Sequence, residues 1–150
     1  MYPSSAIRYL NLPVLPQELT DSIPRDFDAY EKKIQGKNSV GYVWTDSHNH
    51  AVDAWCKKNI CDSVYFAYQI ISGDMVIHKD QGTKTKFIYL LESGGSDVWT
   101  EFYAEDQVTV IQREKIELNR WVLMKVDCYH RVVGVEPGKV RFAITARVFD

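Results

Sequence analysis

Short apolar stretches alternate with turns in the second half of the sequence, and this pattern limits the fold more than any other feature. From Ser63 onward, eight stretches are rich in the β-branched and aromatic residues that pack well in sheets. They span residues 63–71, 75–78, 87–92, 98–103, 108–112, 121–126, 131–135 and 140–149. Turn-forming residues separate them at 72–74, 80–82, 93–96 and 136–139. Such strands, without helices between them, predict an antiparallel sandwich, jelly roll or barrel.

The first part of the chain contains the predicted helices. Residues 16–23 begin with a proline and end before Pro24, as is typical of a short helix. A second helix is predicted to end near Ile60, with Asp46 or Ser47 as its N-cap. Helices are therefore expected only in the first ~60 residues.

The length and composition fit one globular domain. A chain of 150 residues with 45% hydrophobic and 25% charged residues can bury a core. We expect residues 1–62 to give mainly helical support, with a short strand at 41–45. Residues 63–150 are expected to form the core, so the predicted fold class is mainly β.

Charge and cysteine content exclude some classes of partner and compartment. A net charge of −2 gives no bulk attraction to nucleic acid. Three cysteines at 56, 61 and 128 match no common zinc signature and fit reduced thiols. No stretch approaches the ~20 apolar residues of a membrane helix, and no signal peptide is recognisable. We expect a soluble, cytoplasmic protein, and no feature indicates an oligomeric state.

Three residues of the β-rich part form a pattern that fits a metal site. His78 and Asp80 are two positions apart, so on an extended segment their side chains project to the same side. His130 precedes an apolar run and would supply a third ligand from a neighbouring strand. Two histidines and one carboxylate bind non-haem Fe(II) on one face and leave the opposite positions open. His78, Asp80 and His130 are the predicted metal ligands and catalytic residues.

Arg141 indicates an acidic ligand. It lies in the apolar run 140–144. A buried charge without a partner is costly, and a guanidinium can bind a carboxylate with two parallel hydrogen bonds. Arg141 is therefore predicted to bind an acidic co-substrate.

This order of residues resembles the 2-oxoglutarate- and Fe(II)-dependent dioxygenases over residues 65–150. Their pattern is His-x-Asp, fifty or more residues, a second His, and an Arg about ten residues later. The prolyl hydroxylase branch, which includes the oxygen-sensing enzymes, is most similar. Tyr68 and Tyr89 match two tyrosines of its co-substrate pocket, and residues 141–145 match the strand that carries its arginine.

The resemblance implies a double-stranded β-helix core, of the jelly-roll or cupin-like type, and a hydroxylase activity. It implies Fe(II) as the cofactor, with 2-oxoglutarate and dioxygen as co-substrates. Arg141 and Tyr89 would hold the distal carboxylate of 2-oxoglutarate, and Tyr68 would line its pocket. The leading substrate is a prolyl residue in a protein or peptide.

Two departures from the branch bear on the substrate. The interval between His130 and Arg141 is slightly longer than in the oxygen-sensing enzymes, and Arg147 replaces an aromatic residue. A free amino acid, another small molecule or a nucleobase is therefore an alternative substrate. A catalytically silent β-barrel binding module is an alternative of another class.

Several other polar residues are expected to lie on the surface. His48 and His50 fall at a predicted helix start, where neighbouring side chains splay apart. Lys84, Lys86 and Arg131 are expected to be solvated, although one of them would be able to contact substrate.

Overall fold

The computed structural model describes residues 5–25, 33–34, 42–46, 49–62 and 65–149. Within these ranges the chain forms ten strands and two helices. The protein is mainly β, with two antiparallel sheets and few helices, as the sequence predicts.

The larger sheet has seven strands and the smaller sheet has three. In spatial order, the larger sheet consists of β1 (Ile7–Tyr9), β8 (Trp121–Lys125), β5 (Thr83–Glu92), β10 (Arg141–Phe149), β4 (Tyr65–Ile71), β3 (Tyr42–Asp46) and β2 (Lys33–Ile34). The smaller sheet consists of β7 (Val110–Glu114), β6 (Trp99–Tyr103) and β9 (His130–Val133). Neighbouring strands in both sheets are antiparallel.

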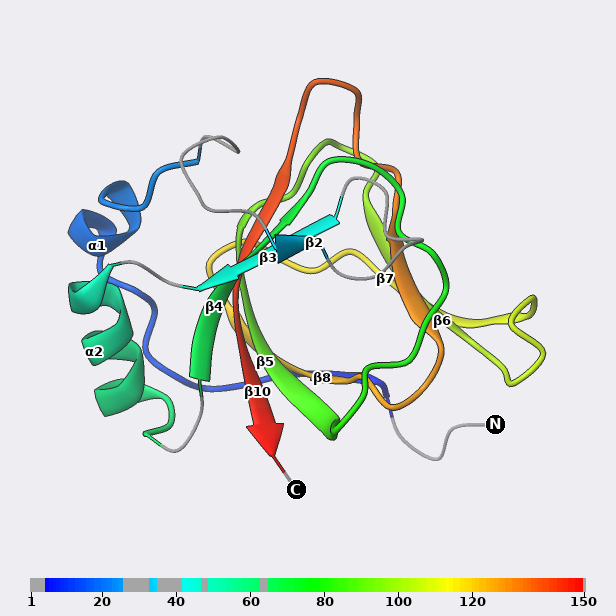
Figure 1. Cartoon of the computed structure of the whole chain (residues 1–150), viewed down its shortest axis with the longest axis horizontal. Coiled ribbons are helices and arrows are strands. Elements are labelled where there is room, and N and C mark those ends of the chain that lie inside the picture. Colours follow the sequence, from blue (N-terminus) through cyan, green and yellow to red (C-terminus); the bar gives the residue numbers. More distant parts are fainter. Residues whose placement is uncertain (1–4, 26–32, 35–41, 47–48, 63–64, 150) are drawn as a thin grey trace.

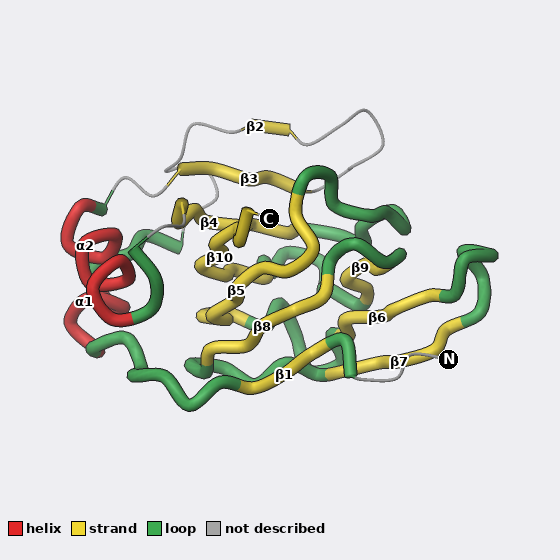
Figure 2. Tube along the Cα trace, turned by 90° about the horizontal axis from the view of Figure 1, so that it is seen from below, coloured by secondary structure: helices red, strands yellow, loops and turns green. Residues whose placement is uncertain are grey.

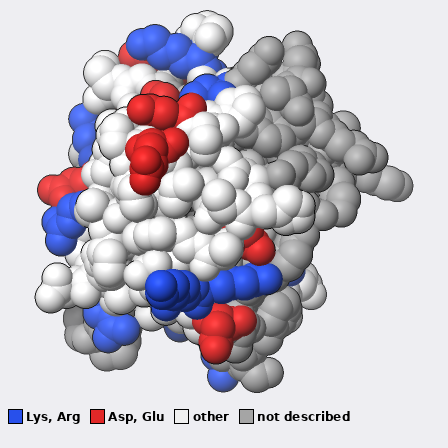
Figure 3. All heavy atoms as spheres, turned by 90° about the vertical axis from the view of Figure 1, so that its left-hand side faces the viewer, with Lys and Arg blue, Asp and Glu red and all other residues white. Residues whose placement is uncertain are grey.

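Two helices, α1 (Gln17–Asp21) and α2 (His50–Asn59), lie against one side of the larger sheet (Figure 1). The smaller sheet lies on the other side, so the molecule has three layers (Figure 2). Neither helix is long and apolar enough to cross a membrane, and the described ranges contain no other helix. On the helix side of the surface, acidic and basic side chains are interspersed among broad uncharged areas (Figure 3).

The second helix begins later than predicted because another residue caps it. Asn49 Oδ1 accepts hydrogen bonds from the backbone N–H groups of Ala51 and Val52, both at 3.1 Å. These bonds satisfy donors that have no partner inside the helix. The cap is therefore Asn49 rather than Asp46, which ends β3, or Ser47, which lies outside the described residues.

Seven of the eight stretches predicted in the β-core form strands, β4 to β10. The exception is residues 75–78, which make an isolated bridge between His78 and His130 instead of a strand. The strand predicted at 41–45 corresponds to β3, whereas β1 and β2 were not predicted.

The two faces of the larger sheet carry separate hydrophobic cores. On β5, Tyr89 and Leu91 belong to a core that includes α2, whereas Ile88 and Leu90 belong to a core that includes Phe102 of the smaller sheet. Successive side chains of a strand point to opposite faces, so the position of a residue along β5 determines which core it enters. The candidate site lies on the face that is turned toward the smaller sheet.

A glycine in the loop between β5 and β6 allows close approach to the start of β10. Gly94 has a φ of +87°, and a Cβ atom there would lie 3.1 Å from the backbone nitrogen of Arg141. The Gly94 carbonyl accepts a hydrogen bond from the N–H of Glu136 at 2.8 Å. Only glycine adopts this conformation without strain, and the loop thereby packs against the backbone of Arg141.

Candidate metal centre

Backbone hydrogen bonds bring the two distant parts of the predicted metal site side by side. The N–H of His78 donates to the carbonyl of His130 at 3.1 Å, and the N–H of His130 donates to the carbonyl of His78 at 2.9 Å. The N–H of Asp80 donates to the carbonyl of Val126 at 2.8 Å. These bonds fix the segment that carries His78 and Asp80 alongside β9, although it is too irregular to count as a strand.

Both histidine rings are oriented by hydrogen bonds to backbone carbonyls. Nδ1 of His78 lies 2.8 Å from the carbonyl oxygen of Val76, and Nδ1 of His130 lies 2.7 Å from that of Cys128. A carbonyl oxygen only accepts, so we assign the proton of each ring to Nδ1. Nε2 of each neutral ring then presents a lone pair, which is the form that binds a metal ion.

Three lone-pair atoms converge at the centre of this arrangement. Oδ1 of Asp80 lies 3.4 Å from Nε2 of His78 and 3.4 Å from Nε2 of His130. One ligand atom from each of the three residues lies within 4.8 Å of the others. Two ligand atoms that each lie about 2.1 Å from a metal ion, with an angle of roughly 90–110° at the ion, are about 3.0–3.4 Å apart. The two distances from Asp80 therefore fit a first-row divalent cation.

Asp80 is held as a carboxylate in a buried position. Burial favours the protonated form, but the Lys86 ammonium and the neighbouring His130 and His78 rings outweigh it and hold the pKa of Asp80 well below its usual range. The two carboxylate oxygens have different partners, because Oδ1 faces the histidines and Oδ2 lies 3.5 Å from Nζ of Lys86. The oxygen that faces the histidines is thus the one available to a cation.

Burial also keeps His130 in its neutral form. The ring is 3% exposed, and its burial lowers the pKa of His130 despite the opposing effect of Asp80. A neutral imidazole at pH 7 needs no deprotonation before it binds a metal ion.

A small cavity adjoins the two histidines and extends to Arg141. Its volume is about 20 Å³, which is room for one or two water molecules. The polar side chains that line it are Gln69, His78, Lys86, Thr100, His130 and Arg141. The apolar ones are Met75, Ile88, Ile116, Met124, Val132 and Ala143. A larger ligand requires some of these side chains to move, and the long, unbranched ones can do so most easily.

Arg141 is a buried cation whose partner is neutral. It is 4% exposed, and its Nη2 donates to Oγ1 of Thr100 at 3.2 Å. Burial lowers the pKa of Arg141 to about 10, so the guanidinium remains charged at pH 7. Within the described ranges no carboxylate forms an ion pair with it. An anionic ligand in this cavity would supply the missing charge.

The structure does not bring Tyr89 and Tyr68 to this cavity, contrary to the sequence-based expectation. Both belong to the core on the helix side of the larger sheet. The hydroxyl of Tyr89 accepts a hydrogen bond from the N–H of Leu15 at 3.1 Å, and the Tyr68 ring packs against Phe142 at 5.3 Å. The neighbouring residues on the same strands, Ile88 and Gln69, face the cavity instead.

Lys86 is the main residue of the site whose position was predicted incorrectly. It is 6% exposed rather than solvated. The alternation of side chains along β5 indicates this position. Lys86, Ile88 and Leu90 point to the same face, and Ile88 and Leu90 belong to the core that includes Phe102. Thr100 and Gln69 were missed as well, since a threonine or a glutamine in a strand gives no distinctive signal.

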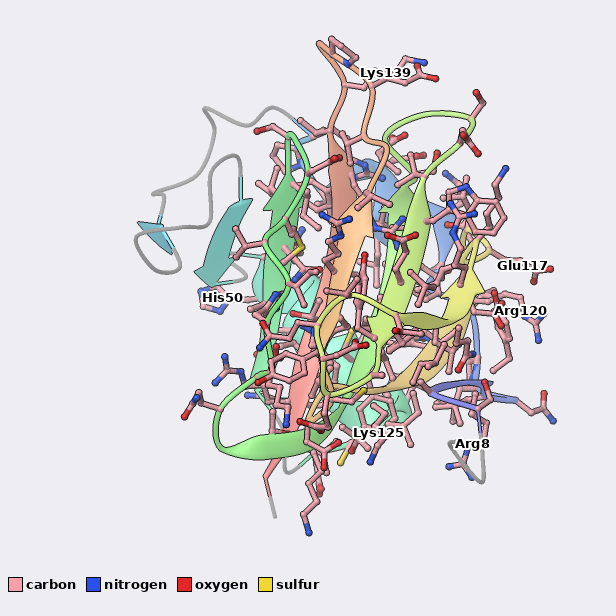
Figure 4. The ribbon with its side chains drawn as sticks, turned by 90° about the vertical axis from the view of Figure 1, so that its right-hand side faces the viewer. Arg8, His50, Glu117, Arg120, Lys125 and Lys139 are labelled. Carbon is pink, nitrogen blue, oxygen red and sulfur yellow. The ribbon has the colours of Figure 1, made fainter. Side chains whose placement is uncertain are left out.

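The surface histidine conforms to expectation. His50 is exposed and lies at the periphery of the molecule, away from the side chains that crowd the space between the two sheets (Figure 4). His48 lies outside the described residues.

Comparisons with solved structures show proteins of similar fold. Neither a family model nor a curated protein sequence matches this chain. A solved structure of Fe(II) HppE in complex with substrate is similar, with a TM-score of 0.50 and 11% identity. A prolyl hydroxylase from Trichoplax adhaerens, in complex with a peptide of the hypoxia inducible factor oxygen degradation domain, has a TM-score of 0.50 and 14% identity.

These similarities cover most of this chain but less of the other proteins. The first match covers 84% of this chain and 60% of HppE, and the second covers 78% of this chain and 66% of the prolyl hydroxylase. A third match, Peruvianin-I, a cysteine peptidase from Thevetia peruviana latex, has a TM-score of 0.47 at 9% identity and bears on no argument. At these identities the comparisons show the fold alone.

Proposed function

We propose that the protein is an Fe(II)- and 2-oxoglutarate-dependent oxygenase that hydroxylates an unactivated C–H bond. One observation carries this proposal: two histidine nitrogens and one carboxylate oxygen converge beside a cavity that also contains a buried arginine, which pairs with no carboxylate of the described residues. A metal ion fits the first feature, and an acidic co-substrate fits the second. We also infer that the two sheets correspond to the double-stranded β-helix of this superfamily.

The residues have distinct roles in this proposal. His78, Asp80 and His130 hold the iron, which when bound supplies the activation of dioxygen. Arg141 binds the distal carboxylate of 2-oxoglutarate, and Thr100 orients its guanidinium. Lys86 holds the oxygen of Asp80 that does not face the histidines, so that one oxygen stays directed at the metal.

The shape of the cavity favours exclusion of bulk water. His130, Arg141 and Lys86 are each less than 7% exposed, so most of the cavity is enclosed, although the side chain of His78 is 29% exposed. Electrostatic interactions inside such a site are stronger than in water, which favours ordered binding of a dianion between the metal and Arg141.

The leading substrate remains a prolyl residue in a protein or peptide, as suggested by the sequence pattern. The solved prolyl hydroxylase with its peptide supports this reading through the fold alone. A free amino acid, another small molecule or a nucleobase is the alternative substrate. A silent binding module would have the same fold but would not consume 2-oxoglutarate.

Turnover of 2-oxoglutarate tests the proposal. Purified protein with Fe(II), 2-oxoglutarate and dioxygen should form succinate, and a screen of proline-containing peptides, free amino acids and nucleic acids should identify which compound gains one oxygen atom. The Asp80→Ala variant should form no succinate, whereas His50→Ala, a histidine variant on the surface, should match the wild type. Succinate formation that is equal in wild type and Asp80→Ala would contradict the assigned site.

A further inference from the structure

Lys86 gives the candidate site one more positive charge than the proposed chemistry requires. It lies on β5, on the face turned toward the smaller sheet, and lines the same cavity as His78, His130 and Arg141. Its side chain is 8% exposed, and its ammonium lies 3.5 Å from Oδ2 of Asp80. Lys86 is therefore a component of the site and not a surface residue.

The charges of the site do not cancel when the proposed metal and co-substrate are bound. Asp80 carries one negative charge, Lys86 and Arg141 carry two positive charges, and a histidine that binds a metal ion is neutral. Fe(II) adds two positive charges and the 2-oxoglutarate dianion removes two. One positive charge is left over, and without Lys86 none would be. A buried site with an uncompensated charge is unfavourable, so a further anion is expected there.

The two cations enter the cavity from backbone positions that are well separated along the sheet. Lys86 is opposite Arg147 in the register of β5 and β10, whereas Arg141 is six positions farther along β10. At a rise of about 3.3 Å per residue, the two backbone positions are about 20 Å apart. The distal carboxylate of 2-oxoglutarate can reach Arg141, but Lys86 is at the metal end, beside Asp80.

From this arrangement we propose that the substrate is a small molecule carrying a carboxylate or another single anionic group, which pairs with Lys86 while its C–H bond faces the metal. The inference rests on the proposed function and, within it, selects the alternative substrate, a small molecule, over a prolyl residue in a peptide. It favours a free acid over a residue inside a peptide chain, because an internal residue has an uncharged amide where a free acid has its carboxylate.

An isosteric pair of probes tests this inference without turnover. Cyclopentanecarboxylate and cyclopentanecarboxamide have nearly the same shape and differ in charge. Each is added to the protein loaded with Mn²⁺ and 2-oxoglutarate, and the paramagnetic relaxation of its ring protons is measured by NMR. The carboxylate should bind roughly 10- to 100-fold more tightly than the amide, as expected for a charge-assisted hydrogen bond.

Three variants assign the preference to Lys86. Lys86→Met should remove it, and Lys86→Arg should retain it because the charge is kept. Lys125→Met is the control: Lys125 is opposite Thr85 on the neighbouring strand, at the periphery of the molecule (Figure 4), and its loss should change nothing. Each variant is saturated with Mn²⁺ beforehand, so that a lower metal affinity does not affect the comparison.

The outcomes separate this inference from the proposed function. If Mn²⁺ and 2-oxoglutarate bind but the wild type does not distinguish the two probes, the inference is wrong and the proposed function stands. The same holds if Lys86→Met still binds the carboxylate more tightly than the amide. It also holds if Lys86→Met lowers the affinity for 2-oxoglutarate as much as Arg141→Met does, because Lys86 would then bind the co-substrate. If neither Mn²⁺ nor 2-oxoglutarate binds, the inference and the proposed function are both wrong.

Discussion

Oδ1 of Asp80 lies 3.4 Å from Nε2 of His130, and neither atom has a proton to share when the ring is protonated at Nδ1. Two lone pairs that face each other in a buried position are unfavourable unless a cation lies between them. The backbone bonds between residues 78 and 130 enforce this arrangement, so the fold itself prepares the site for a metal ion.

Loss of one predicted ligand should abolish tight metal binding. For His78→Ala we expect the affinity for Mn²⁺ or Co²⁺ to fall more than about 100-fold, beyond the 10- to 100-fold typical for an outer-shell residue. Isothermal titration calorimetry measures the effect, with His50→Ala as a matched histidine control. An affinity within a few-fold of the wild type would exclude His78 as a ligand.

Replacement of Arg141 should weaken the binding of the co-substrate much more than the binding of the metal ion. Arg141→Met removes the buried guanidinium beside Thr100, and we expect 2-oxoglutarate to bind about 10- to 100-fold more weakly. Metal affinity should change little. Arg120→Met, which alters an exposed arginine paired with Glu117, is the control.

The position of Tyr89 gives a prediction that separates the structure from the family pattern. Tyr89→Phe should leave 2-oxoglutarate affinity unchanged, because the hydroxyl faces Leu15 on the helix side of the sheet. It should lower the free energy of unfolding by about 1–3 kcal/mol, since the N–H of Leu15 loses its buried acceptor. Urea titration and calorimetry measure the two effects, and a loss of affinity with no loss of stability would place Tyr89 in the site after all.

Stability of the metal-free protein should fall as the pH decreases from 7.5 to 5.5. Burial lowers the folded-state pKa of His130 below its unfolded value of about 6.5, so the unfolded state binds more protons in this range. Protonation therefore favours unfolding, and the stability is recovered as the pH rises. Urea titrations in the presence of a chelator should show a smaller pH dependence for His130→Gln. The depressed pKa of Asp80 acts only below about pH 4 and does not contribute here.

The sequence predicted the strands well because strand formation depends on local patterns, and the structure brings the three residues of the predicted triad together. Alternating apolar residues and turns identified β4 to β10, and the spacing of His78 and Asp80 placed both side chains on one side of the chain. The distance between them and His130 depends on which strands become neighbours, and this was supplied by the resemblance.

The sequence-based reasoning assigned two side chains of β5 to the wrong environment. Tyr89 and Lys86 lie three positions apart on β5, so they point to opposite faces. The family pattern placed the tyrosine in the site and the composition placed the lysine in solvent, but the structure has them the other way round. The apolar neighbours Ile88 and Leu90, which share the inner face with Lys86, are a better guide than either argument.

The central claim is that one site holds both Fe(II) and 2-oxoglutarate, and anaerobic absorption spectroscopy tests it most directly. Addition of Fe(II) and 2-oxoglutarate to the wild type should produce the weak visible charge-transfer band of the iron–2-oxoglutarate chelate. The band should be absent in His78→Ala and should require more 2-oxoglutarate in Arg141→Met. Absence of the band in the wild type at saturating concentrations, together with no succinate formation in air, would contradict the claim.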